Sequence, residues 1–152
     1  MSDDPVMDEI LAAITGLLRG DRVGGRAALE AIWARIAHDP QPIHECTLAH
    51  YLADAQDDLA SELAWDLRAL SAARRCTDAD AALHASQPSI AAFMPSLHVN
   101  LADDYFKLHD LDRAREHLAA ANASAKHLND DAYGRLVRGG IERLAHRLAT
   151  GG

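Results

Sequence analysis

The side chains of this sequence best suited to chemistry are its nine histidines, and the first chemistry they suggest is metal binding. His44-Glu45 begins the HExxH pattern of zinc enzymes, but Leu48 occupies the place of the second histidine. Two histidine–aspartate pairs have spacings that put both side chains on one helix face: His50 with Asp54, and His109 with Asp112. Neither pair has a third ligand at helical spacing, whereas a zinc site needs about three or four. The sequence therefore predicts no metal site and no cofactor.

Motifs for nucleophilic or phosphate chemistry are also missing from the sequence. It contains no GxSxG and no catalytic Cys-His signature, and the glycines of residues 20–25 do not follow the GxxxxGK pattern of a phosphate-binding loop. Three pairs of adjacent aspartates resemble paired carboxylates, but helix caps and turns explain them: Asp57-Asp58, Asp103-Asp104 and Asp130-Asp131. We therefore expect a protein without catalytic activity. A metal-dependent enzyme that uses His50 and Asp54 is the remaining catalytic alternative.

The charge and composition of the chain exclude further classes. Its formal net charge is −8 and its pI about 5.5, so its surface repels nucleic acid phosphates and anionic lipids, and we expect neither as a partner. Cys46 and Cys76 belong to no CxxC pattern, and we expect two reduced thiols. No apolar run approaches the roughly 18 residues of a membrane span, and no signal-peptide core opens the chain; we expect a cytoplasmic protein. Abundant alanine and arginine, with lysine only at Lys107 and Lys126, are typical of a high-GC bacterium.

Residues 96–126 show the clearest structural pattern in the sequence. Apolar side chains recur there at steps of three and four, first at Leu97, Leu101, Tyr105 and Leu108 and then at Ala114, Leu118, Ala121 and Ala125. Such steps place each set on one face of a helix. Because the break at residues 109–111 is short, the two helices must fold back on each other as an antiparallel hairpin.

This hairpin resembles a tetratricopeptide repeat (TPR), a helical motif of roughly 34 residues with large and small apolar side chains at fixed positions. Six residues match the motif in register: Leu101, Ala102, Tyr105, Ala114, Leu118 and Ala121. Residues 48–72 match it less completely. Two departures are that His109 replaces the usual glycine at the turn and that no proline closes the repeat.

The resemblance implies an all-α fold, a TPR-like right-handed superhelix of antiparallel helix hairpins with about seven helices. We expect a single domain over residues 1–152, with hairpins over 6–38, 43–75 and 89–128 and a C-terminal capping helix over 131–149. Residues 76–89 contain an insertion relative to the regular repeat, for which we expect an extension of the preceding helix or a short extra helix. The next helix either begins at Pro95 or begins near Ser89 and kinks at the proline; the burial that Ile90, Phe93 and Met94 require favours the second.

Local signals also predict where the helices begin and end. Asp4 precedes a proline and starts the first helix, Ser61 and Asp130 are predicted N-caps, and the third helix is expected to reach Asp58. Gly139-Gly140 falls inside the last helix. A close contact with the preceding helix and a weak point within the helix are the two explanations.

In TPR arrays the first helix of each hairpin lines a concave groove. Carried onto this sequence, the resemblance assigns to the groove His50, Asp54, Asp57, Asp58, Val99, Asn100, Asp103, Phe106 and Lys107. Most of the charged members are aspartates, so we expect a non-catalytic interaction module that binds a basic, Arg/Lys-containing peptide segment of a protein partner. The alternative is a homo-oligomeric structural unit without a peptide ligand, in which Phe93, Met94 and the last helix pack against a second copy.

Overall fold

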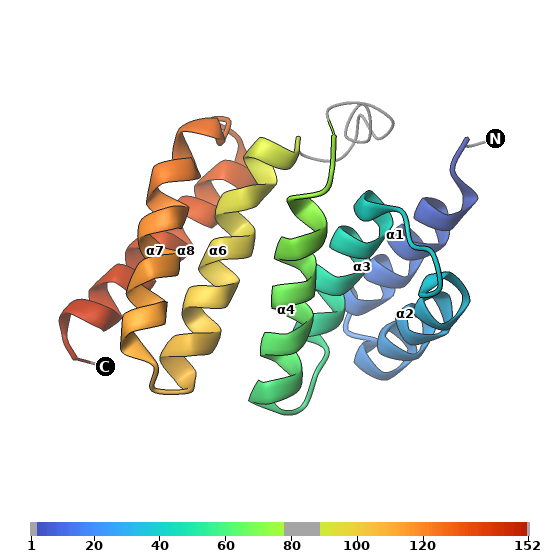
Figure 1. Ribbon diagram of the computed structural model, residues 1–152, viewed down its shortest axis with the longest axis horizontal. Helices are drawn as coiled ribbons and strands as arrows, with labels where there is room; N and C mark the ends of the chain where they lie inside the picture. Colours follow the sequence, from blue (N-terminus) through green and yellow to red (C-terminus); the bar gives the residue numbers. More distant parts are fainter. Residues whose placement is uncertain (1–2, 78–88, 152) are drawn as a thin grey trace. The chain divides into compact units, whose positions relative to one another are not determined.

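The computed structural model describes residues 3–77 and 89–151, and within them every regular element is helical, with seven α-helices, one 3-10 turn and no strand (Figure 1). The all-α fold class is therefore confirmed. None of these helices has the length and apolar character needed to cross a membrane. The chain divides into two compact units, Met1–Arg75 (unit 1) and Cys76–Gly152 (unit 2), and each is described by itself. The expected insertion at residues 76–89 lies almost wholly outside the described residues.

Unit 1 consists of two helix hairpins (Figure 1). The first contains α1 (Pro5–Leu18) and α2 (Arg22–Ile36), and the second contains α3 (Pro42–Asp54) and α4 (Leu59–Ala73). Helix α3 packs on α1 and α2 as well as on α4, and it is buried from Ile43 to Ala53 with Tyr51 partly exposed. The apolar core around α3 is formed by Met7, Ile10, Ile14, Leu29, Ile32, Leu48, Leu52 and Leu70.

Unit 2 is a hairpin with one further helix packed against it. Helices α6 (Ile90–Lys107) and α7 (Leu111–Ser124) form the hairpin, the 3-10 turn η1 (Ala125–His127) follows, and α8 (Ala132–Ala149) packs on both hairpin helices. Of the TPR-matching residues, those with the smallest exposure are Leu101, Ala102, Ala114 and Ala121, all fully buried. Helix α6 begins at Ile90 and contains Pro95. The prediction of a start near Ser89 is therefore confirmed.

Aspartates and one serine cap the helices where the chain enters them. The N-cap side chains accept a hydrogen bond from a backbone N–H three residues later; they are Asp4, Asp21, Asp58, Ser89, Asp110 and Asp131. The predicted caps Ser61 and Asp130 were wrong, because Asp58 and Asp131 take these roles. Helix α3 also ends at Asp54, short of the predicted Asp58.

The turn between α1 and α2 depends on a glycine. Gly20 has a φ of 94°, in the left-handed region that favours glycine. Its N–H donates to the carbonyl of Leu17 (3.0 Å), and the N–H of Asp21 donates to the carbonyl of Gly16 (2.9 Å). This pair of bonds is the Schellman motif that ends many helices.

The turn between α6 and α7 repeats this geometry with a histidine in place of the glycine. His109 has a φ of 63°. Its N–H donates to the carbonyl of Phe106 (3.0 Å), and the N–H of Asp110 donates to the carbonyl of Tyr105 (2.9 Å). The missing turn glycine noted in the sequence is thus a residue in a strained backbone conformation.

Replacing His109 with glycine is expected to stabilise the protein. His109→Gly removes the left-handed strain and should raise the free energy of unfolding by about 1 kcal/mol, measured by urea denaturation. The matched control is Gly20→His, which introduces the same strain at the equivalent turn and should lower the free energy of unfolding by a similar amount. Equal stability of His109→Gly and the parent would contradict this account.

Three glycines of α8 differ in what surrounds them. A Cβ atom on Gly134 would lie 1.9 Å from the carbonyl oxygen of Asn129, so this position requires glycine. A Cβ on Gly140 would lie at an ordinary contact distance of 3.5 Å from Val99, and one on Gly139 would meet only the mobile end of Arg143 at 3.1 Å. Neither Cβ atom would come within 4 Å of the preceding helix, α7, so a close contact with that helix does not explain the Gly139-Gly140 pair.

Alanine substitutions should separate these positions. Gly139→Ala and Gly140→Ala should each raise the free energy of unfolding by roughly 0.5–1 kcal/mol, because alanine favours a helix interior over glycine. Gly134→Ala should lower the free energy of unfolding through its clash with the backbone of Asn129. Thermal unfolding followed by circular dichroism measures all three. A stabilising Gly134→Ala would show that the start of α8 is placed differently.

Candidate functional site

Unit 1 presents a surface where its two hairpin turns meet. We define the turn surface as Leu17, Leu18, Arg22, Val23, Tyr51, Asp54, Ala55 and Asp57. It includes two of the aspartates that the resemblance assigned to a groove. The last turns of α1 and α3, the start of α2 and the α3–α4 turn supply these side chains.

Two arginines at the start of α2 hold the α3–α4 turn in place. Arg22 donates to the backbone carbonyls of Asp54 (2.9 Å) and Gln56 (2.7 Å) and to the Asp57 carboxylate (3.0 Å). Arg26 donates to the other Asp57 oxygen (3.1 Å) and to the carbonyl of Ala55 (3.3 Å). The hydrogen bond from Arg22 and the charge of Arg26 lower the pKa of the Asp57 carboxyl. Asp57 therefore acts within the protein as the counter-charge of this arginine pair.

Two hollows lie on either side of Arg22. The first has a volume of about 220 Å³, and its lining includes Leu17, Leu18, Tyr51 and Asp54. The second has a volume of about 310 Å³, and its lining includes Val23. Leu18 is 76% exposed and Val23 83% exposed, which makes them the two most exposed large apolar side chains of the described residues. The turn surface thus combines accessible apolar side chains with a carboxylate at Asp54.

The groove residues predicted on the third helix have separate roles. Asp54 lies at the exposed end of α3, whereas His50 is buried one turn earlier. Asp58 caps α4 by accepting hydrogen bonds from the N–H (2.8 Å) and the hydroxyl (2.8 Å) of Ser61. His50 and Asp54 therefore differ in accessibility, although their spacing places them on one side of α3.

Burial controls the ionisation of the polar groups on this side of α3. Burial lowers the pKa of His50 to about 4, so the ring is neutral at pH 7. Burial, followed by the Asp54 carboxylate, raises the pKa of Tyr51. Tyr51 therefore faces the first hollow as a neutral phenol beside a negative charge.

Three of the groove residues predicted on α6 contact α8, namely Val99, Asp103 and Phe106. Val99 packs against the cluster that contains Val137 and Ile141, and Phe106 packs against the cluster that contains Leu144 and Leu148. The guanidinium of Arg147 lies 4.4 Å from the centre of the Phe106 ring. These contacts with α8 cover part of the face along which the resemblance predicts an open groove.

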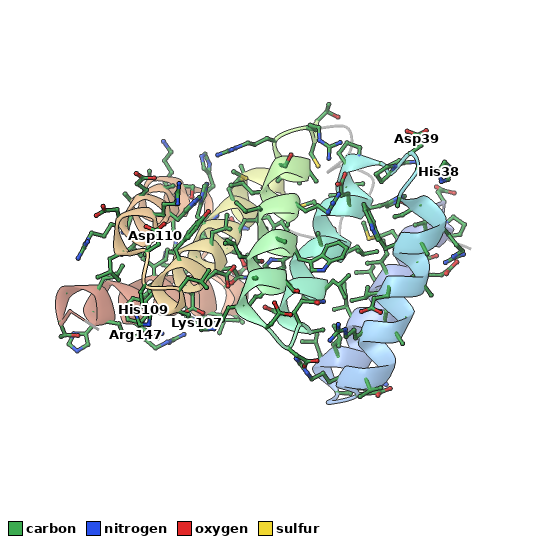
Figure 2. All side chains as sticks on the ribbon, turned by 60° about the horizontal axis from the view of Figure 1, so that its bottom comes forward. His38, Asp39, Lys107, His109, Asp110 and Arg147 are labelled. Atoms are coloured by element: carbon green, nitrogen blue, oxygen red, sulfur yellow. The ribbon has the colours of Figure 1, made fainter. Side chains whose placement is uncertain are left out.

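Asp103 and Lys107 belong to the same ionic cluster. The Asp103 carboxylate pairs with Lys107 (2.8 Å) and with Arg147 (3.3 Å), and Asn100 is partly buried on the same helix. Figure 2 shows Lys107 and Arg147 at one end of unit 2, near the turn at His109. The structure thus brings Asp103, Phe106 and Lys107 together with an arginine that the sequence analysis did not assign to the site.

Other buried polar groups stabilise unit 1. Glu45 is 5% exposed, and its carboxylate accepts hydrogen bonds from Arg68 (3.2 Å) and Arg75. The Arg68 guanidinium also lies over the rings of Trp33 (4.9 Å) and Trp65 (5.5 Å), which contact each other edge to face. Arg68 thus joins α2, α3 and α4, and Glu45 serves as its buried counter-charge.

The sequence analysis missed the apolar half of the turn surface. Periodicity places Leu17 and Leu18 on the apolar stripe of the first helix, and it treats every leucine on such a stripe as core. In the structure Leu18 is the last residue of α1 and extends beyond the packed part of the hairpin. The signal available in the sequence was the pair of adjacent leucines directly before Arg19-Gly20-Asp21, since one member of such a pair must leave the buried stripe.

Comparison with known proteins identifies no relative: no family model, no curated protein and no solved structure matches the chain.

Protonation of His50 should make stability pH-dependent. Its pKa is about 4 in the folded chain and near the ordinary value of about 6.5 in the unfolded chain. The unfolded state therefore binds the proton first, and the free energy of unfolding should fall by about 1.4 kcal/mol per pH unit as the pH drops from 6.5 towards 4. In His50→Gln this part of the fall should be absent. His38→Gln, which changes an exposed histidine, is the control and should keep it.

Proposed function

We propose that this protein is a non-catalytic interaction module with a TPR-like arrangement of helix hairpins, and that its turn surface binds a basic segment of a protein partner. The observation that carries the proposal is the hollow of about 220 Å³ in which exposed Leu18 and partly buried Leu17 and Tyr51 lie beside Asp54. Apolar walls with one convergent charge are typical of a binding site.

The chemistry of this hollow suits a lysine or arginine side chain. The aliphatic stem of such a residue packs on Leu18 and on the face of Tyr51, while its cation pairs with the Asp54 carboxylate. Arg22 forms a fixed wall of the hollow, because its guanidinium is bound to two backbone carbonyls and to Asp57. An apolar residue next to this lysine or arginine in the bound segment contacts Val23 in the adjoining hollow.

The charge of unit 1 favours the same class of partner. Residues 1–75 contain 13 acidic and 7 basic side chains, a formal charge of −6 of the total −8. This excess attracts a basic segment over distances of about 10 Å at moderate ionic strength. The proposal therefore keeps the basic partner expected from the sequence and places its binding on unit 1 through Asp54.

A charge reversal at Asp54 tests this function. The probes are three short labelled peptides in which arginine alternates with leucine, glutamate with leucine, or arginine with serine, and fluorescence anisotropy measures their binding. The parent should bind the arginine–leucine peptide most tightly, because only that peptide supplies both the cation and the apolar contacts. Asp54→Lys should weaken this binding about tenfold or more, and Leu18→Ser should weaken it as well.

The control is Asp39→Lys, which makes the same change of charge at an exposed aspartate between α2 and α3, at the far end of the hairpins from the turn surface (Figure 2). It should bind like the parent, and circular dichroism should show all variants folded. Equal loss of binding in Asp39→Lys and Asp54→Lys would show that the net charge of the protein, and not the position of Asp54, determines peptide binding. Equal binding of the glutamate–leucine peptide by the parent would contradict the role of Asp54.

A further inference from the structure

A third hollow of unit 1 lies between α1 and α2 and differs in kind from the two of the turn surface. This α1–α2 groove has a volume of about 550 Å³, and its lining is mostly alanine and glycine with charged residues at its rim. From α1 it includes Glu9, Ala12 and Gly16, and from α2 Gly24, Ala28 and Ala31. Ala12, Ala28 and Ala31 are exposed. The first hairpin therefore has a shallow apolar face on which a helix can approach the backbone closely.

Gly16 is the residue of this groove that the protein itself does not require. It lies inside α1, where glycine costs roughly 1 kcal/mol relative to alanine. A Cβ atom at this position would have no described atom within 4 Å. By contrast, a Cβ on Gly25 would lie 2.6 Å from Leu17, so the packing of α1 on α2 accounts for that glycine.

The charges along α1 identify the occupant of the groove. On the stripe that contains Ala12 and Gly16, Glu9 lies one turn before and Arg19 follows one turn after, directly beyond the end of the helix. If a second α1 runs antiparallel across this stripe, Ala12 of one copy faces Gly16 of the other, and Glu9 faces Arg19. Both ends of the stripe are then paired at once. Such self-complementarity is the property of a two-fold interface between identical chains.

We propose that two copies of this chain associate through the α1–α2 groove, with their α1 helices antiparallel about a two-fold axis near Ala12 and Gly16. In one copy Glu9 pairs with Arg35 of α2. Both side chains are about half exposed, and such surface pairs contribute little free energy. Glu9 is thus available to Arg19 of the second copy. This interface uses residues outside the turn surface, so it stands independently of the proposed function.

Charge reversal on each side of the stripe tests the interface. Light scattering and sedimentation equilibrium of the parent over a range of concentrations should show a monomer–dimer equilibrium, because association follows mass action. Glu9→Arg places two arginines opposite each other, and Arg19→Glu places two glutamates opposite each other. Each variant alone should dissociate at least tenfold more readily than the parent. An equimolar mixture of the two should regain the dimer, since every facing pair is then complementary.

A steric variant tests the close approach separately. A Cβ atom at Gly16 would have no described atom within 4 Å, so Gly16→Leu should leave a folded chain of comparable thermal stability as a monomer, but it should abolish the dimer. Thr15→Leu changes the adjacent exposed residue, which does not line the groove, and should leave the dimer intact. A parent that remains monomeric at every concentration would overturn the proposal. So would a dimer unaffected by Gly16→Leu, or single charge variants that fail to recover on mixing.

Discussion

The interaction on which unit 1 depends is the set of hydrogen bonds from Arg22 to the α3–α4 turn. Its guanidinium reaches two backbone carbonyls, of Asp54 and Gln56, and the carboxylate of Asp57. These carbonyls belong to the end of α3, where the helix itself leaves acceptors without partners. One side chain therefore joins the first hairpin to the second and fixes the two turns beside each other. Arg68 has a corresponding role further along the hairpins, through Glu45 and two tryptophan rings.

Because Arg22 is held in this way, the carboxylates around it divide into two groups. Asp57 neutralises the arginine pair and Asp58 caps a helix, so both serve the fold. Asp54 contributes its backbone carbonyl to the same network and presents its side chain at the hollow beside Leu18 and Tyr51. Some exposed carboxylates of this chain therefore have a role in the fold. What distinguishes the turn surface is the position of one carboxylate next to exposed apolar side chains, and this combination gives the proposed site its preference for a basic residue.

The turn surface and the α1–α2 groove, as proposed, suit different partners for physical reasons. The turn surface has a carboxylate beside exposed apolar side chains, which suits a side chain that is long and basic. The α1–α2 groove is shallow, contains alanine and glycine, and carries charges of both signs along one helix, which suits another helix with the same pattern. In unit 2 the corresponding faces of the hairpin are already covered, because α8 packs on α6 and α7 and Arg147 binds Asp103 and Phe106. Helix α8 thus occupies that face of the hairpin.

The helices themselves followed from local physics that the sequence contains. Apolar side chains at steps of three and four determined the helical segments, and aspartates before them determined where they begin. Even the strained turn at His109 was visible as a missing glycine. The errors were of one or two turns at most, at Ser61 and at the end of α3, because neighbouring polar residues compete for the same cap.

What only the tertiary structure decided is which polar and apolar side chains remain accessible. Leu17 and Leu18 are adjacent at the end of one helix, yet Leu17 is partly buried and Leu18 is exposed. Asp54 and Asp57 lie three residues apart, and the carboxylate of Asp57 pairs with Arg22 and Arg26. Exposure and charge pairing depend on residues distant in the chain, such as Arg22 for Asp57 and Arg147 for Asp103, and periodicity carries no information about them.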